Sequence, residues 1–509
     1  MPTDYTLPHC GIPAKHRLKY GAILLVYMCI AVFLTSRDNP WLHSPYVQHV
    51  DSAMFFMGGK AWANGLTPYV DFTDSKGPLL WLIHMVAYFI SYTSYLGIMV
   101  MIAPVMAGAL YFSWLTAVRI TGNERLGLWA AAPMPLVWFL TLQFIETRAE
   151  TYAQLPMAYL LYVMVTGMRS PGLLTPAKAF WSGVSLAALL LIKWSFVAYG
   201  GILVLAQLIC IAKFNWQLTC RYLAWGIAGV LVCCAPFVVY LLCAGAFDAF
   251  IHEYFVNTLA TTGIASGDKN IVTSFWEHLS LICKDIKTII PLLAIIFGNI
   301  IAFRRFPSLK WLPSSAIGLI IIMVIATMLW PYYVQILGFA AISFFACAAV
   351  AIKTLLRGTL SACFERLWPL ALLCCLLPGI RICVLGSELH RADYTPNYKE
   401  LADVAIKQWC DSNGIKSPQI IYVDGLDFGL GVSTQAIPGG KHWFRQFGST
   451  EEMDTERRHQ AKAATADILV VFFEHTADPS EYGYTQIFSA EVPREAFSRM
   501  RVYARSVNK

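Results

Sequence analysis

The ionisable side chains between residues 51 and 76 stand out, because the segments on both sides of them are apolar. Asp51, Asp71 and Asp74 supply carboxylates, and Lys76 supplies a cation directly before a Gly-Pro pair. A carboxylate can take a proton from an attacking hydroxyl or hold a metal ion, whereas a lysine beside a helix N-terminus can bind a phosphate. The stretch therefore combines groups suited to proton transfer with a group suited to holding a phosphorylated substrate.

Each of these residues also has an explanation that needs no chemistry. Asp51 precedes SAMFFMGGKAW, which is amphipathic by spacing, so it could be the N-cap of that helix. Asp71 and Asp74 lie in PYVDFTDSKGP, where an aspartate can form a turn before a proline. Lys76 could extend towards lipid headgroups. For Asp51 capping and function can coexist, because a capping interaction also holds the carboxylate in place.

Further charged residues follow in three other apolar surroundings. QFIETRAETYAQLP holds Glu146, Arg148 and Glu150, Lys193 interrupts LLLIKWSFV, and His252 lies in AFIHEYFVN. Ionisable residues near a bilayer are costly, so each is a candidate functional residue. The structural alternatives are an ion pair between Glu146 and Arg148, a helix-dipole contact for Glu150, a headgroup contact for Lys193 and a packing role for His252.

The composition indicates an integral membrane protein. Of the 509 residues, 57% are hydrophobic and 14% are charged, whereas soluble domains have about 25% charged residues. Because a crossing needs about 20 residues, the apolar segments predict about 11 transmembrane helices. They lie at 19–36, 97–118, 126–142, 151–167, 179–192, 196–212, 222–243, 288–303, 312–329, 333–352 and 367–385.

Basic residues alternate between successive loops, and this alternation sets the expected orientation. The loops predicted to be cytoplasmic are rich in Lys and Arg and lie near 15–19, 119–125, 169–178, 213–221, 304–310 and 353–366. The candidate site residues all fall in the opposite, outer loops. Counting the apolar run 78–92 as a span would break the alternation, so we predict an interfacial or re-entrant helix there.

The composition changes after residue 386. Charged residues become frequent, and β-rich runs appear at 419–424, 467–473, 484–492 and 501–506, together with a segment of helical periodicity. The sequence therefore predicts a polytopic α-helical membrane domain at 1–385 and a small soluble α/β domain at 386–509. An odd number of crossings places the N-terminus in the cytoplasm and the C-terminal domain outside, on the periplasmic side of a bacterial inner membrane.

The opening loop resembles that of the GT-C membrane glycosyltransferases. The similar group is the family-39-like set, which includes protein mannosyltransferase relatives, aminoarabinose transferases and RgtA/B/C/D-like sugar transferases. Members typically show an Asp near the loop start, then G-x-x-P-Y-x-D, a further acid and D-x-K-P-P-L. Two later segments, ETRAETYAQLP and LLLIKWSF, are also similar to family segments. The matching loop positions are Asp51, Gly65, Pro68, Tyr69, Asp71, Asp74 and Lys76, with Gly77 in place of the first proline of the family pattern.

The resemblance implies a GT-C fold and an inverting transfer of a sugar from a polyprenyl-phosphate donor to an acceptor on the outer face. It implies that Asp51 is the catalytic base and that Asp74 orients the acceptor or helps to bind a cation. Some members use a divalent cation and others do not, so Mg²⁺ or Mn²⁺ held by Asp51 and Asp74 is an open alternative. The residues expected to bind substrate or phosphate are Lys76, Arg148, Glu150, Lys193, Asp71 and His252.

The expected partners are the polyprenyl-phosphate-linked sugar, a lipid, glycan or protein acceptor, and membrane lipids, with no nucleic acid. Two other functions compete with this one. A lipid-linked oligosaccharide polymerase or ligase would use Arg and His from large late loops rather than an Asp-rich first loop. A transporter or flippase of lipid-linked sugars would carry charges along the membrane midplane and show repeated halves. The charges of this sequence gather instead in the outer loops.

Overall fold

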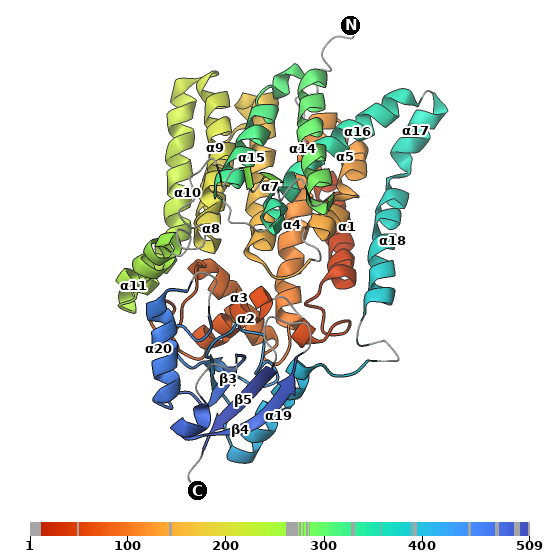
Figure 1. The fold of residues 1–509 in the computed structure, drawn as a ribbon. Helices are drawn as coiled ribbons and strands as arrows, with labels where there is room; N and C mark the ends of the chain where they lie inside the picture. Colours follow the sequence, from red (N-terminus) through yellow and green to blue (C-terminus); the bar gives the residue numbers. More distant parts are fainter. Residues whose placement is uncertain are drawn as a thin grey trace.

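The computed structural model consists of a helical bundle with a small mixed sheet at one of its ends (Figure 1). It describes residues 12–506 apart from 48–49, 142–144, 261–272, 274–275, 278, 281–283, 285, 327–330, 357, 388, 390–393, 446–448, 474–477 and 493–498. Two short helices lie between the bundle and the sheet (Figure 1).

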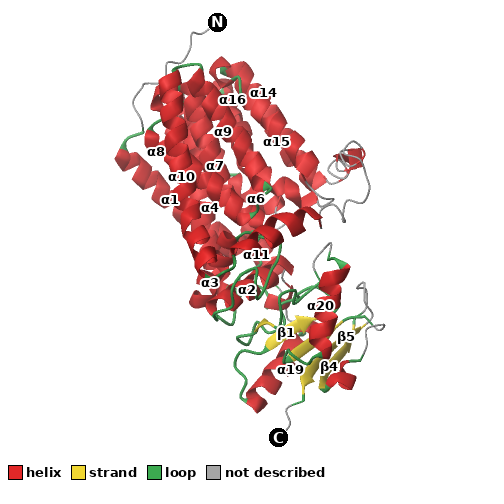
Figure 2. Ribbon diagram, turned by 90° about the vertical axis from the view of Figure 1, so that its left-hand side faces the viewer, coloured by secondary structure: helices red, strands yellow, loops and turns green. Residues whose placement is uncertain are grey.

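The apolar segments expected to cross the membrane are largely helical where the structure describes them. The long helices run side by side in two views (Figures 1 and 2). They are α1 (Ala14–Thr35), α4 (Leu96–Thr121), α5 (Glu124–Ala131), α6 (Met134–Thr141), α7 (Ala149–Arg169), α8 (Pro176–Ile192), α9 (Phe196–Ala212), α10 (Trp216–Cys243), α14 (Ile286–Arg305), α15 (Leu312–Ala326), η5 (Pro331–Ala341), α16 (Ile342–Leu355), α17 (Thr359–Arg366) and α18 (Trp368–Gly386).

Length and hydropathy identify several of these helices as candidate membrane spans. Among the described residues the four candidates are Ala14–Thr35, Leu96–Thr121, Trp216–Cys243 and Ile336–Leu355, and α17 with the first part of α18, bent by 53°, would make a fifth. The surface of α10 exposes large apolar side chains such as Leu231 and Leu242, which is normal only where lipid covers them. The chain is thus a multi-pass membrane protein, and the number of 11 crossings stays a prediction.

One expected span is broken. The segment 126–142 was predicted as a single helix, but α5 ends at Ala131 and α6 begins at Met134. Pro133 lies at the break. A proline has no backbone N–H and its ring clashes with the carbonyl four residues earlier, so it interrupts a helix. The prediction of one helix rested on the apolar composition of this segment and took no account of Pro133.

The two helices between bundle and sheet are α2 (Val50–Ala63) and α3 (Pro78–Ile90). The expectation that α2 is amphipathic is wrong, because every residue from Ser52 to Ala61 is buried. Gly58 packs against the ring of Trp81 in α3, and Gly59 packs against the backbone of His84. A Cβ at either glycine would collide with α3, so the glycine pair permits the close approach of the two helices.

The C-terminal module, which we define as residues 398–506, contains the sheet and its helices (Figure 2). The strand order is β2-β1-β3-β5-β4, with β1 parallel to β2 and β3, and β5 antiparallel to β3 and β4. The β-rich runs of the sequence thus correspond to strands, whereas the domain boundary at 385/386 stays a prediction. The elements are α19 (Tyr398–Asn413), β1 (Gln419–Tyr422), β2 (Ile437–Pro438), α20 (Glu451–Lys462), β3 (Ile468–Val471), β4 (Tyr484–Glu491) and β5 (Arg499–Arg505).

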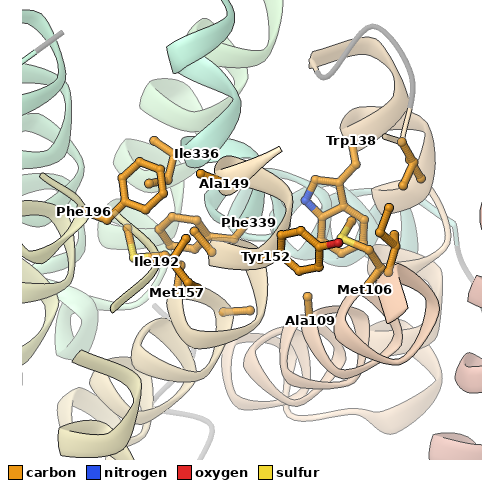
Figure 3. Close-up of a cluster of buried hydrophobic side chains, with 14 of the residues drawn as sticks. Met106, Ala109, Trp138, Ala149, Tyr152, Met157, Ile192, Phe196, Ile336 and Phe339 are labelled. Carbon is orange, nitrogen blue, oxygen red and sulfur yellow. The ribbon is translucent and has the colours of Figure 1, made fainter. Parts of the chain in front are cut away.

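Helix α7 lies at the centre of the bundle, and almost all of its side chains are buried. Figure 3 shows Tyr152 and Met157 of α7 among apolar side chains from α4, α6, α9 and η5. Ala149 and Ile192 belong to the same cluster. They are neighbours in sequence of the charged residues at the start of α7 and the end of α8. The apolar core therefore supports the ends of both helices where those charges lie.

Candidate active site

The loop between α2 and α3 is held by Tyr69, which is fully buried. Its backbone has a φ of 69°, a left-handed conformation that is uncommon for a residue with a bulky side chain. The Tyr69 N–H donates to the carbonyl of Phe72 (2.7 Å), and its hydroxyl donates to the carbonyl of Lys76 (2.9 Å). Strain of this kind persists only where the surroundings enforce it, and it is often found at functional sites. Tyr69 thus fixes the segment that carries Asp74 and Lys76.

Asp74 and Lys76 form an ion pair within this loop. The Lys76 Nζ lies 3.2 Å from Asp74 Oδ2, and the Asp74 side chain is only 5% exposed. Lys76 Nζ also lies 5.5 Å from the centre of the Phe55 ring, close enough for a cation–π interaction. The two residues are therefore neighbours in space, as the predicted site requires.

Gly77 joins this loop to the end of α8. The Gly77 N–H donates to the carbonyl of Ile192 (3.0 Å), one residue before Lys193. A Cβ at position 77 would collide with the carbonyl of Leu191 and the hydroxyl of Tyr254. Proline, the residue usual in the family pattern, lacks the N–H and would also clash. The departure at Gly77 is thus matched to the packing of this particular chain, and it places the Lys76 loop beside Lys193.

Lys193 forms an ion pair with Glu150 in the first turn of α7. Lys193 Nζ lies 3.3 Å from Glu150 Oε1, and the Glu150 side chain is 3% exposed. Arg148 and Lys76 also act electrostatically on the Glu150 carboxylate. Because each of these cations favours the negative charge, Glu150 is the acid around which three separate segments meet.

Arg148 is buried and forms an ion pair with Glu146. Burial alone would lower the pKa of Arg148, but the carboxylates of Glu146, Asp51 and Glu150 outweigh it and hold that pKa above its usual value. The ion pair of Glu146 and Arg148 that the sequence allowed is therefore present. Glu146 is not the only acid that acts on Arg148, because the charges of Asp51 and Glu150 act on the same guanidinium.

Asp51 is the second residue of α2, so it lies inside the first turn and does not cap the helix. It is partly exposed, and its charge acts on Arg148. We call Asp51, Asp74, Lys76, Glu146, Arg148, Glu150 and Lys193 the charged cluster. Lys76 and Lys193 keep 14% and 19% of their side-chain surface, whereas the side chains of Glu146, Arg148 and Glu150 keep at most 4%. A ligand arriving from outside would thus meet the two lysines and Asp51 first.

Two residues expected at the site lie elsewhere in its surroundings. Asp71 is exposed, and its carboxylate accepts a hydrogen bond from the N–H of Thr67, four residues earlier in the chain (2.7 Å). The His252 side chain is 62% exposed, and its Nδ1 lies 3.7 Å from Glu253 Oε1. Both residues thus lie outside the charged cluster as we define it, and their substrate-binding roles stay predictions.

The exposure of His252 gives a direct test. If His252 binds substrate, as the sequence predicts, we expect His252→Asn to lower the rate of the reaction by about ten-fold or more, because a hydrogen bond to substrate is lost. If the side chain is only a surface group, as its exposure allows, the rate should change by less than about two-fold. The measurement is kcat and KM of the purified variant beside the wild type. A loss of ten-fold or more would mean that the exposed imidazole contacts substrate.

Asp38 is a further buried acid that no sequence pattern indicated; it lies in the loop after α1 and is completely buried. Its Oδ2 accepts a hydrogen bond from the N–H of Thr147 (2.7 Å), between Glu146 and Arg148. Thr147 in turn shares hydrogen bonds with His84 Nε2 (2.9 Å) and the Tyr152 hydroxyl (2.8 Å). Asp38 therefore fixes the loop that enters α7. In the sequence it is one polar residue in SRDNPW, which reads as an ordinary turn.

Asp38 makes stability depend on pH. Burial, helped by the charge of Glu146, raises the pKa of Asp38 to about 7. An acid with a raised pKa favours folding when protonated, so its contribution is present at low pH and is lost as the pH rises from about 4 to about 7. We expect wild-type protein to lose about 2 kcal/mol of stability between pH 5 and pH 8 through this group, and Asp38→Asn to lose much less.

The measurement for Asp38 is the thermal unfolding of detergent-solubilised protein across that pH range. Asp411→Asn is the matched control, since the Asp411 side chain is 66% exposed. Equal slopes for the wild type and Asp38→Asn would contradict the assignment of this pH dependence to Asp38.

The chemistry of the charged cluster is that of a site for an anionic substrate with a neighbouring base. Within the part of the chain that the structure describes, no group of three His, Cys, Asp or Glu side chains could hold a metal ion. Binding of Mg²⁺ or Mn²⁺ between Asp51 and Asp74 stays a prediction. The residues brought together are thus carboxylates and fixed cations from the loop after α2, the start of α7 and the end of α8.

The fold resembles that of a solved membrane protein, ArnT from Cupriavidus metallidurans. ArnT from Cupriavidus metallidurans, bound to undecaprenyl phosphate, superposes with a TM-score of 0.58 over 97% of this chain and 98% of ArnT, at 15% sequence identity. The apo state of the same ArnT gives a TM-score of 0.59 over 96% of this chain and 98% of ArnT, also at 15% identity.

The archaeal oligosaccharyltransferase of Archaeoglobus fulgidus, in complex with Zn and sulfate, overlaps less closely. Its TM-score is 0.42, at 12% identity over 95% of this chain and 73% of that protein. No protein-family model matches the sequence, and no curated protein matches it. The similarity to ArnT therefore establishes the fold, over nearly the whole of both chains.

Proposed function

We propose that the protein is an integral-membrane glycosyltransferase that moves a sugar from a polyprenyl-phosphate donor to an acceptor on the extracytoplasmic face. The observation that carries the proposal is the charged cluster, in which Asp51 lies near Arg148 while Lys76 and Lys193 are partly accessible. The fold it shares with ArnT, which was solved with undecaprenyl phosphate, supports a lipid phosphate as the anion. The site lies at the end of the bundle next to the C-terminal module, which we place in the periplasm (Figure 1).

The proposed reaction is a single displacement. The acceptor hydroxyl or amine attacks the anomeric carbon, and Asp51 takes its proton as the new bond forms. The bond between that carbon and the phosphate oxygen breaks, and polyprenyl phosphate leaves with the electron pair. Lys76, Arg148 and Lys193 stabilise the charge that develops on the phosphate. One displacement inverts the configuration at the sugar carbon, and Asp74 orients the acceptor.

The charge balance of the charged cluster is relevant to whether the proposed reaction needs a divalent cation. It contains three cations and four carboxylates: Lys76, Arg148 and Lys193 against Asp51, Asp74, Glu146 and Glu150. A phosphate that enters this site must compete with carboxylates for the lysines, or bring a cation with it. Addition of a chelator, followed by Mg²⁺ or Mn²⁺, separates the two cases: a metal-free mechanism keeps its rate, and a metal-dependent one recovers only when metal is returned.

The test of the function is transfer by purified protein in detergent or liposomes. A panel of radiolabelled polyprenyl-phosphate sugars is offered with lipid, glycan and peptide acceptors, and the release of polyprenyl phosphate is measured with the labelled product. Nucleotide sugars serve as control donors. Stoichiometric release of lipid phosphate with one donor supports the proposal. Transfer from a nucleotide sugar alone, or movement of intact donor across the bilayer without transfer, would contradict it.

A further inference from the structure

Helix α2 carries a buried lysine on the side opposite to Asp51. Lys60 follows Asp51 by nine positions (60 − 51), and at about 100° per residue the two side chains point to roughly opposite sides of the helix. Asp51 acts on Arg148 at the bundle. Lys60 is only 1% exposed and meets the C-terminal module. One helix thus contacts the charged cluster with one side and the module with the other.

Lys60 binds the backbone of a single loop of the module. Its Nζ donates to the carbonyls of Gly431 (3.1 Å) and Thr434 (2.9 Å), and it lies 5.0 Å from the centre of the Phe56 ring. Burial lowers the pKa of Lys60 to about 8, although the charges of Asp403 and Asp427 oppose this shift. The ammonium group is therefore held by neutral carbonyls inside the protein, with two acids further away.

The loop that receives Lys60, residues 427–434, is itself tightly fixed. Gly429 and Gly431 have φ values of 80° and 85°, which a residue with a side chain rarely adopts. The carboxylate of Asp403 in α19 accepts hydrogen bonds from the N–H groups of Gly431 and Ser433 and from the Tyr46 hydroxyl. These contacts hold the loop in the conformation in which the carbonyls of Gly431 and Thr434 both accept from Lys60.

Burial of the Lys60 ammonium between α2 and loop 427–434 has an unfavourable contribution to the free energy of folding. Burial of a charge costs free energy unless it is fully compensated, and an apolar side chain of similar volume is often equally or more stabilising. An apolar contact, however, is not directional, whereas two hydrogen bonds to fixed carbonyls specify one orientation. The use of a lysine at this position therefore favours a role in geometry over a role in stability.

We propose that Lys60 is a positioning residue that fixes α2 against loop 427–434 and thereby sets the place of Asp51 in the charged cluster. The catalytic part of this inference rests on the function proposed above. It makes the C-terminal module a part of the catalytic unit. A second link supports this, because the N–H of Thr73, next to Asp74, donates to the carbonyl of Lys441 in the module (3.0 Å).

The test compares Lys60→Met with Lys407→Met in the full-length protein. Met keeps the length of the lysine stem but cannot donate, and Lys407 is a matched control that is half exposed and pairs with Asp411 on α19. We expect Lys60→Met to lower kcat about 10–100-fold with KM within about three-fold, because a misplaced base affects the reaction step more than donor binding. Amide hydrogen exchange should become about ten-fold faster in α2 and in loop 427–434, and remain unchanged in α7.

Asp403→Asn is the second, milder variant, since it weakens the support of loop 427–434 without removing Lys60. If Lys60→Met does not fold, the kcat of Asp403→Asn and its amide hydrogen exchange in α2 test the proposal in the same way. An unchanged kcat per folded molecule, or unchanged exchange in α2, would overturn the positioning role. Wild-type protein that is inactive with every donor would refute the proposed function instead. The exchange of α2 would still decide whether Lys60 holds the helix.

Discussion

We expect Asp51→Asn to lower kcat for sugar transfer by about 10²–10⁴-fold, the range typical of a missing general base. Asn keeps the shape of the side chain but cannot accept the acceptor proton. Asp51 is partly exposed and its charge acts on Arg148, so we expect its carboxylate to be accessible to an acceptor next to the proposed phosphate site. The measurement is the initial rate of product formation at saturating donor and acceptor.

The control for this variant is Asp248→Asn, which removes an exposed carboxylate on α11 (Phe247–Ile251), outside the charged cluster. Binding of the donor to Asp51→Asn should persist, because Lys76 and Lys193 remain in place. A kcat within three-fold of wild type would transfer the base role to another acid of the cluster, with Asp74 the first to be tested.

The second large effect is expected at the ion pair between Glu150 and Lys193. Removal of one partner of a buried pair costs about 3–5 kcal/mol, because it leaves an uncompensated charge. Arg148 and Lys76 also act on Glu150, so we expect Lys193→Met to destabilise the protein by about 3 kcal/mol, the lower end of that range. Transfer activity should fall as well, since Lys193 is one of the cations proposed to hold phosphate. Chemical or thermal unfolding in detergent gives the stability difference.

A double-mutant cycle separates the two consequences of Lys193→Met. Combining Lys193→Met with Glu150→Gln should recover most of the lost stability, because the buried carboxylate is no longer charged. Activity should stay low, because the cation is still missing. If the stability losses of the two single variants simply add in the double variant, the two side chains do not stabilise each other, although Lys193 Nζ lies 3.3 Å from Glu150 Oε1.

The main features of the fold followed from the sequence because they depend on local patterns. Long apolar segments became helices, and β-rich runs after residue 386 became strands. The break at Pro133 was visible in the sequence and was overlooked, since hydropathy does not register a missing N–H. The burial of α2 could not be foreseen, because it depends on packing against α3 and on contacts with the C-terminal module, such as that of Lys60 with Gly431, more than 300 positions away in the chain.

In the candidate site, too, some residues could be predicted from the local sequence and others could not. Asp51, Asp74, Lys76, Arg148, Glu150 and Lys193 were found because a charge in an outer loop of an apolar chain is itself a signal. Asp38 gave no such signal, because its importance arises from complete burial against Thr147. Lys60 was similarly hidden, since a lysine on an apparently amphipathic helix is expected to face solvent. Both residues are buried by partners distant in the sequence, Thr147 for Asp38 and the loop 427–434 for Lys60.

The fit of Gly77 against α8 has a consequence for chimaeras between this protein and others of the same fold. Its N–H and its missing side chain are both matched to the last turn of α8, through the carbonyls of Ile192 and Leu191. Chimaeras that exchange only the segment before α3 would introduce a proline against an unchanged partner. Exchange of both segments as one unit would preserve the match, so we expect such hybrids to fold only when the two segments are exchanged together.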